Sequence, residues 1–231
     1  MINFLEWDSD FFGYKVGEVN SVSNQLAGDI AIAKREKYKL LYFKVDPKNI
    51  ILNQECIRNN GLLVDEKVTY FRDVPIFESQ NNQTELYNDI YSNEKLTNLA
   101  LQSGVYSRFK VDSNFKDNEF EKLYTTWIEK SVSKQISKEL IIQKKDDIVI
   151  GLLTLGIKNE RADIGLLAVD EFYRGNNIGL NLVRRAFQES HKLKMTYIQV
   201  VTQKSNKIAC LFYEKMGFTI DSVENIYHFW I

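Results

Sequence analysis

A glycine-containing turn between a buried-type strand and a helix is the most specific chemical signal in this chain. Residues 166–180 read LLAVDEFYRGNNIGL. Gly175 and Gly179 lack side chains that would hold an anion away, and Asn177 tolerates a left-handed backbone. A helix that starts in this way leaves backbone N–H groups free at its positive end, which favours a pyrophosphate, and Arg174 adds a charge. An ordinary helix N-terminus with glycines for tight packing is the alternative.

A second signal lies near the end of the chain, where two small side chains stand between an amide and a phenol. Four residues at spacing i, i+3, i+4 and i+7 share one helical face: Asn206, Ala209, Cys210 and Tyr213. This face predicts a shallow groove with polar ends that admits a thioester. The remaining apolar residues are expected to pack the helix onto the sheet: Ile208, Leu211 and Phe212. The alternative for Tyr213 is an amphipathic core tyrosine.

A third segment combines a hydroxyl, two cations and an aromatic ring. Ser107, Arg108, Phe109 and Lys110 follow one another directly. Such a set suits a diphosphate and a stacked base or sugar. A solvated basic loop before a helix is the alternative, and the residues alone do not decide between the two.

Composition excludes several classes of protein. The chain has 231 residues, enough for one large domain or two small ones, and a net charge of −1, which gives no field that recruits nucleic acid or an anionic membrane. Cys56 and Cys210 make no disulfide framework, and with His191 and His228 as the two histidines no metal cluster is expected. The acidic start MINFLEWDSDFF and the lack of a long apolar run predict a cytoplasmic protein without membrane insertion.

Periodicity and turn residues predict the elements that position these residues. Before residue 78 we expect helices over 24–37 and 50–60 and strands over 40–46 and 63–74. The polar stretch 78–83 reads as a linker. After it we expect helices over 94–103, 115–132, 177–193 and 205–216, and strands over 140–144, 148–156, 161–169, 196–202 and 218–231. In the helix over 177–193, Arg184, Arg185, Gln188 and Glu189 are expected to face outward.

This order predicts an α/β (α+β) fold with a mixed, largely antiparallel sheet flanked by helices. The expected domains are residues 1–77 and 84–231. An internal echo supports a relation between them, because 40–71 and 196–227 share the order strand, helix, glycine, strand. Gly61 matches Gly217 and Asp65 matches Asp221, whereas Ile57 stands where the second copy has Tyr213. The first copy therefore carries no chemistry in this interpretation.

Taken together, these motifs resemble the GNAT acetyltransferases over residues 148–231. That family's cofactor motif falls on Arg174 to Gly179, with Asn177 in place of the usual central glycine, and its later motif falls on Asn206 and on Tyr213 to Phe218. The resemblance implies a GNAT fold in which the ends of two adjacent strands splay apart to admit the pantetheine arm of acetyl-CoA. It implies a degenerate GNAT-like N-terminal lobe. The cofactor would contact Leu167, Ala168, Val169, Arg174, Gly175, Asn176, Asn177, Ile178, Gly179, Leu180 and Asn206.

Three further segments resemble the bacterial TDP-fucosamine acetyltransferase family. They are residues 5–13 (LEWDSDFFG), 103–112 (SGVYSRFKVD) and 123–128 (LYTTWI). This resemblance implies acetylation of the amino group of a nucleotide-linked 4-amino-4,6-dideoxy sugar, as in the synthesis of cell-surface polysaccharides. Ser107 and Arg108 would then bind the substrate. No metal and no nucleic-acid partner are expected, and the oligomeric state stays open, with a homodimer as one option.

The expected chemistry is direct attack of the amine on the thioester, with both substrates held in line. Tyr213 would protonate the departing thiolate, Asn206 would help to orient it, and backbone N–H groups of the splayed strand would stabilise the oxyanion. The group that removes the proton from the amine is not readable. Two alternatives remain: acetylation of another amine, such as a peptide N-terminus or a polyamine, and a CoA-binding module without turnover.

Overall fold

The computed structural model describes residues 1–231 except 21, 23, 77–82 and 117. The first half of the chain contains these elements: β1 (Ile2–Phe4), α1 (Glu6–Phe12), β2 (Val16–Val19), α2 (Leu26–Arg35), β3 (Leu40–Val45), α3 (Ile50–Arg58), β4 (Leu62–Asp73), β5 (Thr84–Leu86), α4 (Glu94–Ser103) and α5 (Arg108–Val111). The second half contains these: α6 (Glu119–Val132), β6 (Glu139–Lys145), β7 (Ile148–Lys158), β8 (Arg161–Val169), the 3₁₀ turn η1 (Glu171–Tyr173), α7 (Ile178–Lys192), β9 (Tyr197–Gln203), α8 (Lys207–Lys215) and β10 (Thr219–Trp230).

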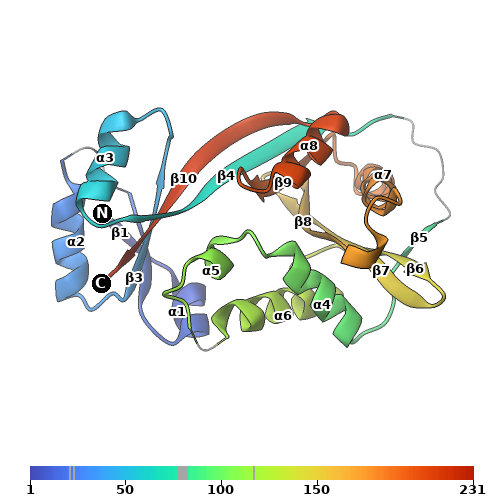
Figure 1. Ribbon diagram of the computed structural model, residues 1–231, viewed down its shortest axis with the longest axis horizontal. Coiled ribbons are helices and arrows are strands. Elements are labelled where there is room, and N and C mark those ends of the chain that lie inside the picture. The colour runs from blue at the N-terminus through green and yellow to red at the C-terminus, as the bar shows by residue number, and fades with distance from the viewer. Residues whose placement is uncertain (21, 23, 77–82, 117) are drawn as a thin grey trace.

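One ten-stranded sheet joins both halves of the described chain. The strand order is β1-β2-β3-β10-β4-β9-β8-β7-β6-β5. Only β2–β3 and β8–β9 among these neighbours pair in parallel, so the expected mixed, largely antiparallel α/β sheet is confirmed. The long strands β4 and β10 run side by side from the left end of the molecule to the region of β9 and α8 (Figure 1). The N-terminus and the C-terminus both lie at the end of the molecule that contains β1, β2 and β3, on the left in Figure 1.

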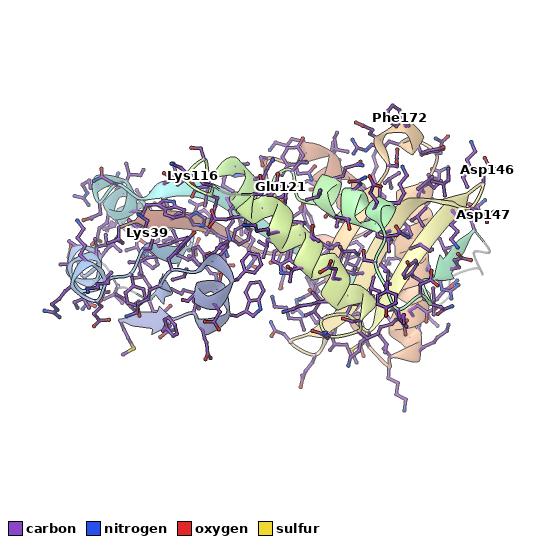
Figure 2. All side chains as sticks on the ribbon, turned by 90° about the horizontal axis from the view of Figure 1, so that it is seen from below. Lys39, Lys116, Glu121, Asp146, Asp147 and Phe172 are labelled. Carbon is purple, nitrogen blue, oxygen red and sulfur yellow. The ribbon has the colours of Figure 1, made fainter. Side chains whose placement is uncertain are left out.

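Helices cover the sheet on both faces. On one face α4 and α6 pack on β6, β7 and β8, and α6 runs obliquely across the underside of the molecule (Figure 2). On the other face α7 packs on β6, β7 and β8 through Leu182, Val183, Ala186 and Phe187, which are fully buried as the helical pattern predicts. At the N-terminal end α2 and α3 enclose a separate apolar cluster against β3 and β10.

The internal echo has the expected connectivity, because β3-α3-β4 and β9-α8-β10 both run strand, helix, strand. The strands interleave, since β10 lies between β3 and β4 while β4 lies between β10 and β9. Asn49 and Asn206 cap the two helices in the same way. Counted from these caps, the equivalent of Tyr213 is buried Cys56, so the sequence alignment to Ile57 is wrong by one residue. The division of the chain at residues 77 and 84 stays a prediction, and residues 78–82 of the expected linker lie outside the described residues.

The structure corrects one outward-facing assignment, that of Glu189, and two inward-facing ones, those of Ile208 and Leu211. Glu189 is buried with 3% of its surface exposed, because the positive side chains of Arg185 and Lys192 reach over it and bond its carboxylate at 2.7 and 2.8 Å. Ile208 and Leu211, expected beneath α8, are 79% and 56% exposed. The sheet takes the other face of α8 instead, which buries Cys210 and Tyr213.

Leu182 and Leu211 make a direct test of this packing. We expect Leu182→Ala to lower the free energy of unfolding by about 2–5 kcal/mol, because it empties a fully buried site. Leu211→Ala should change it by less than about 0.5 kcal/mol, since that side chain already contacts water. Urea denaturation of the two variants checks this, and equal losses would place Leu211 in the core.

Candidate functional site

The parallel pairing between β8 and β9 stops part-way along both strands. Only three register pairs form, Ala162 with Ile198, Asp163 with Gln199 and Ile164 with Val200. β8 then continues to Val169 and β9 to Gln203, but within the described chain the two strands form no further pairs with each other. The two strand ends therefore separate, and a gap opens in the middle of the sheet.

A bulge in β8 explains why the strands part at this point. The register with β7 shifts between Leu153 and Leu155, where Thr154 faces the start of the unpaired stretch. The Thr154 hydroxyl accepts a hydrogen bond from the Leu166 N–H at 2.8 Å, in place of a backbone carbonyl. A Cβ at Gly165 would lie 2.9 Å from that hydroxyl oxygen, so the position needs glycine. The extra residue bends β8 away from β9.

The bend leaves one edge of β8 without a strand partner. The Asp170 N–H donates to Ile150 on β7 at 2.9 Å, and successive backbone groups alternate in direction along a strand. The N–H and C=O groups of Leu167 and Val169 therefore face the gap, whereas those of Ala168 face β7. Of the three β8 residues that were expected to contact the cofactor, Leu167 and Val169 present their backbone to the gap and Ala168 does not.

The glycine turn has the backbone geometry that its sequence predicts. Gly175 and Asn177 take left-handed φ values of 83° and 59°. No side chain among the described residues caps α7, whose first helical bond runs from the Asn181 N–H to the Asn177 carbonyl. The N–H groups of the first helical residues, Ile178, Gly179 and Leu180, therefore point out of the helix end without helical acceptors. Such an end binds anions.

The flanking side chains hold this turn against the end of β8. Arg174 donates through Nε to the Val169 carbonyl at 3.2 Å and through Nη2 to Gln102 at 3.2 Å. The Asn176 amide closes the turn on the Tyr173 carbonyl at 3.0 Å. Arg174 and Asn176 are both exposed, so the positive charge stands at the surface beside the start of α7.

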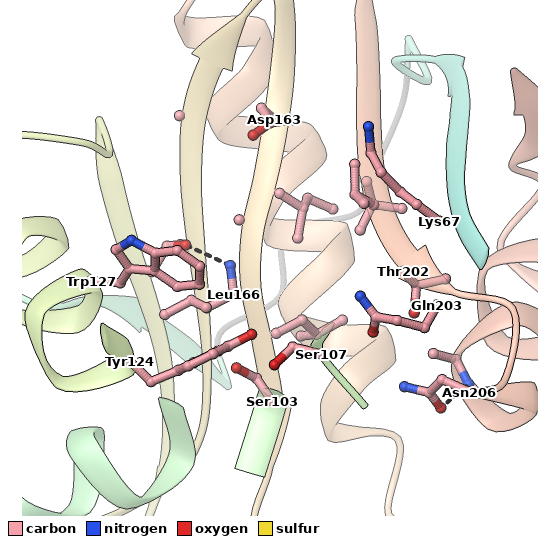
Figure 3. A pocket seen from close by; sticks show the side chains of 18 of the residues that line it. Lys67, Ser103, Ser107, Tyr124, Trp127, Asp163, Leu166, Thr202, Gln203 and Asn206 are labelled. Carbon is pink, nitrogen blue, oxygen red and sulfur yellow. Dashed lines mark hydrogen bonds between the residues drawn. The ribbon is translucent and has the colours of Figure 1, made fainter. Parts of the chain in front are cut away.

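A cavity of about 620 Å³ lies where β8 and β9 separate. Its walls come from both halves of the chain (Figure 3). The α4–α6 side contributes Ser103, Ser107, Arg108, Tyr124 and Trp127; β8 contributes Leu166 and Leu167; β4 and β9 contribute Asp65, Lys67, Thr202 and Gln203; and α8 contributes Asn206, Ala209 and Tyr213.

Residues 104–218 match the family described as Acetyltransferase (GNAT) family. These residues belong to the GNAT acetyltransferase family. The matched range contains the β8–β9 gap, the glycine turn and Tyr213, and the expectation of a GNAT fold and of an N-acetyltransferase domain is confirmed.

Individual proteins resemble parts of the chain. The spore coat polysaccharide biosynthesis protein SpsD of Bacillus subtilis (strain 168) is 25% identical over 137 residues, which cover 59% of this chain and 47% of SpsD. Human N-alpha-acetyltransferase 30 is 39% identical over 61 residues, 26% of this chain and 17% of that protein. The match thus spans about half of the first relative and less of the second.

Solved structures show the same fold at low sequence identity. A conserved protein of unknown function from Staphylococcus epidermidis ATCC 12228 superposes with a TM-score of 0.65 at 11% identity, over 93% of this chain and 83% of its own. A tandem GNAT protein of the clavulanic acid biosynthesis pathway superposes with a TM-score of 0.57 at 9% identity, over 93% of this chain and 75% of its own.

Tyr213 of the GNAT domain is both a core residue and a cavity residue. It is 5% exposed and packs its ring against Tyr70, Phe212 and Phe218 at centroid distances of 6.0, 5.4 and 5.8 Å. Burial raises the pKa of its phenol above the ordinary value. The hydroxyl is therefore protonated at neutral pH. Asn206 caps α8, accepting from the Ala209 N–H at 3.2 Å, and also lines the cavity.

Only part of the expected substrate-binding segment lines the cavity. Ser107 and Arg108 line the cavity, whereas Lys110 turns outward to Glu121 at 3.0 Å. The Arg108 guanidinium lies 4.0 Å from the centre of the Tyr42 ring. Its Nη1 is buried without a hydrogen-bond partner in the described structure. A buried guanidinium nitrogen without a partner is costly, so this group is available to a ligand.

Sequence reasoning missed the part of the cavity that β4 supplies. Asp65 and Lys67 stand on that strand and line the cavity. The charge of Asp65 does not single it out, because the next residues of β4, Glu66 and Lys67, are charged too. Its place at the cavity depends on how β4 inserts between β10 and β9, which the sequence does not show.

Sequence reasoning also missed a buried pair behind the site. His228 is fully buried and its Nδ1 lies 2.6 Å from an Asp112 carboxylate oxygen that also accepts from Trp230 at 2.9 Å. Burial lowers the pKa of His228 to about 4, against the opposing effect of Asp112. Burial alone would raise the pKa of Asp112, but hydrogen bonds led by that from His228 lower it to about 2. His228 does not line the cavity, so it remains unassigned as a base, as does exposed His191.

Within the described residues no cluster of His, Cys, Asp and Glu side chains is suited to hold a metal ion. No helix there has the length and apolar character needed to cross a membrane.

Proposed function

We propose that this chain is an acetyl-CoA-dependent N-acetyltransferase that acts by direct attack on the amino group of a nucleotide-linked amino-deoxy sugar of the dTDP-4-amino-4,6-dideoxyhexose type. The observation that carries this proposal is the convergence of the β8–β9 gap, buried Tyr213 and cationic Arg108 on one cavity. The enzymes of the GNAT family use acetyl-CoA, which supplies an activated acetyl thioester when bound.

The residues present fit this cosubstrate. The backbone groups of Leu167 and Val169 that face the gap suit an amide-bearing pantetheine arm. The N–H groups at the start of α7, held open by left-handed Gly175 and Asn177, suit a pyrophosphate. Arg174 at the surface adds a cation beside them.

The cavity gives three of its groups distinct roles in the transfer. A backbone N–H of β8 that faces the gap donates to the carbonyl oxygen as negative charge develops there. The Tyr213 hydroxyl donates its proton to the sulfur as the C–S bond breaks. The side-chain amide of Asn206, placed at the start of the same helix, helps to orient the leaving group.

Charge favours an anionic acceptor. Among the described residues, four cationic side chains and two carboxylates line the cavity: Lys44, Lys67, Arg108 and Lys158, and Asp65 and Asp163. Lys44 and Lys67 are partly neutralised by Glu18 and Glu224 at 2.9 and 2.7 Å. The Arg108 nitrogen without a partner suits a phosphate oxygen. The similarity to a polysaccharide biosynthesis protein agrees with a sugar substrate.

A peptide N-terminus is the second candidate acceptor. The specific observation in its favour is the 39% identity over 61 residues to human N-alpha-acetyltransferase 30. The two classes differ in charge near the amine, because a nucleotide sugar brings a diphosphate and a peptide brings none.

A panel of acceptors tests the proposal. We expect acetyl-CoA consumption with TDP- or UDP-linked amino sugars and none with the matching hydroxyl sugars, because only the amines can attack the thioester. Arg108→Ala should raise KM for the nucleotide sugar by at least about tenfold, the effect of losing one charge-assisted hydrogen bond. If only peptides are acetylated, the acceptor is a peptide N-terminus and the sugar proposal is wrong.

The glycine turn makes a separate prediction. Gly179→Val should weaken acetyl-CoA binding at least about tenfold, because the added methyl groups enter the space above the helix end and approach Phe212, which a Cβ alone already meets at 3.4 Å. The matched control is Gly28→Val in α2, where a Cβ meets nothing within 4 Å. Calorimetry measures both affinities, and an unaltered affinity in Gly179→Val contradicts the phosphate site.

Tyr213 is tested against its neighbour Tyr70. Tyr213→Phe should lower kcat by roughly 10²–10⁴ with little change in Tm, because it removes the proton donor and keeps the ring. Tyr70 is not among the cavity-lining residues, and its hydroxyl donates a hydrogen bond to Glu214 at 2.8 Å. Tyr70→Phe loses this bond, so it should lower the free energy of unfolding by about 1 kcal/mol and preserve kcat. Melting curves and single-turnover rates on the same samples separate the two roles, and a normal rate in Tyr213→Phe would leave the reaction without its acid.

A further inference from the structure

Asp65 is a carboxylate in the cavity that the acid chemistry of Tyr213 does not use. Its side chain lines the cavity from β4 and the residue is 8% exposed. One carboxylate oxygen, Oδ1, is buried without a hydrogen-bond partner in the described structure. An unpaired buried acceptor costs stability, and such groups persist where a ligand completes them.

The groups around Asp65 leave this oxygen unsatisfied. On β4, Glu66 pairs with Lys204 at 2.7 Å and Lys67 pairs with Glu224 at 2.7 Å. From β3, Lys44 pairs with Glu18 at 2.9 Å. Each of these neighbours is already occupied by another partner.

The remaining neighbours come from three other elements. The Gln203 amide of β9 interacts with the Asp65 carboxylate, and Oδ1 is the oxygen that has no hydrogen-bond partner in the described structure. Arg108 of α5 acts on Asp65 through its charge but lies over the Tyr42 ring, and Tyr124 of α6 lines the same cavity. Burial raises the pKa of Asp65 to about 6, against the lowering effect of Arg108. At neutral pH the group is therefore mostly ionised and suited to accept a proton.

Asp65 lines the same cavity as the residues proposed to carry out the transfer. β4 pairs with β9 up to Lys67 and Gln203, and Asp65 lies two residues beyond Lys67 on β4. β9 ends at Gln203, and Asn206 caps the helix α8 that follows it. Asp65, Asn206 and Tyr213 thus line one cavity from adjacent elements. Asp65 thus lies on the side of the cavity away from the free edge of β8, with β9 between the two strands.

We propose that Asp65 binds the ammonium group of the acceptor and takes its proton, an inference that rests on the proposed acetyl transfer. The ammonium gives one proton to Asp65, and the neutral nitrogen then forms the C–N bond to the thioester carbon while the C–S bond breaks. Tyr213 protonates the sulfur and regains a proton from the nitrogen as the amide forms. Asp65 returns its proton to water, so an ammonium and a thioester become an amide, a thiol and one proton.

Asp65→Asn and Asp221→Asn form a matched pair of variants. Asp221 occupies the corresponding place in the sequence echo, yet it is exposed, pairs with Arg161 at 2.7 Å and lies outside the cavity. With whichever amine the wild-type protein acetylates, dTDP-4-amino-4,6-dideoxygalactose or a short peptide, Asp65→Asn should lower kcat/KM by roughly 10²–10⁴. Asp221→Asn should keep the wild-type value.

The pH profile separates a base from a structural counter-ion. In the wild type, kcat/KM should fall on the acid side as pH drops through about 6, where Asp65 becomes protonated. In Asp65→Asn that limb should move up to the acceptor's own amine pKa, because only the neutral amine can then react. A rate loss with an unmoved limb overturns the base role.

Stability and binding complete the test. The pKa of Asp65 is raised in the folded state, so its ionised form destabilises the fold above about pH 6 and this effect vanishes as pH falls below the unfolded value. Asp65→Asn should therefore keep or raise Tm at pH 8 and leave acetyl-CoA affinity unchanged; a lower Tm would make Asp65 a structural partner of Arg108. If the wild type acetylates an amine and Asp65→Asn matches it, only this inference fails. If the wild type acetylates no amine, the proposed function fails with it.

Discussion

The loss of pairing between β8 and β9 beyond Ile164 and Val200 is the constraint on which the site depends. Backbone groups freed by such a gap need partners from side chains, water or a ligand. Thr154 bonds the Leu166 N–H at the bulge, and Arg174 bonds the Val169 carbonyl at the strand end. The backbone groups between these two anchors stay open toward the gap. The same bend creates the free edge and the cavity into which it opens.

The cavity walls are shared between distant parts of the sequence because β4 and β10 interleave. β4 inserts between β10 and β9, which brings Asp65 and Lys67 to the side of the cavity opposite β8. α5 brings Arg108 from a third direction, fixed on the Tyr42 ring of β3. The GNAT match ends at residue 218, before β10 begins, so the two long strands that join the halves lie outside it. The cavity walls thus include residues beyond the matched range, such as Asp65 and Lys67.

Buried charge distinguishes the cavity from the structural pair behind it. The His228 Nδ1 lies 2.6 Å from an Asp112 carboxylate oxygen to which Trp230 also donates, so this carboxylate has its partners, although the His228 Nε2 has none in the described structure. Asp65 and Arg108 also carry buried polar atoms without partners, and these two residues line the cavity. Both sets are buried ionisable groups, and only the second has space beside it for a ligand.

The sequence determined most of the long elements, because the spacing of apolar residues such as Leu182, Val183 and Phe187 is visible within one helix. It also determined the glycine turn, because Asn177 is a residue type that tolerates the left-handed backbone it adopts. It missed the short elements β1, β2, β5, α1 and α5, which are too short to show a period. Tertiary structure alone decided which face of α8 meets the sheet, that Arg185 and Lys192 bury Glu189, and that Asp65 reaches the cavity. Each depends on contacts between segments far apart in the chain, which no local pattern encodes.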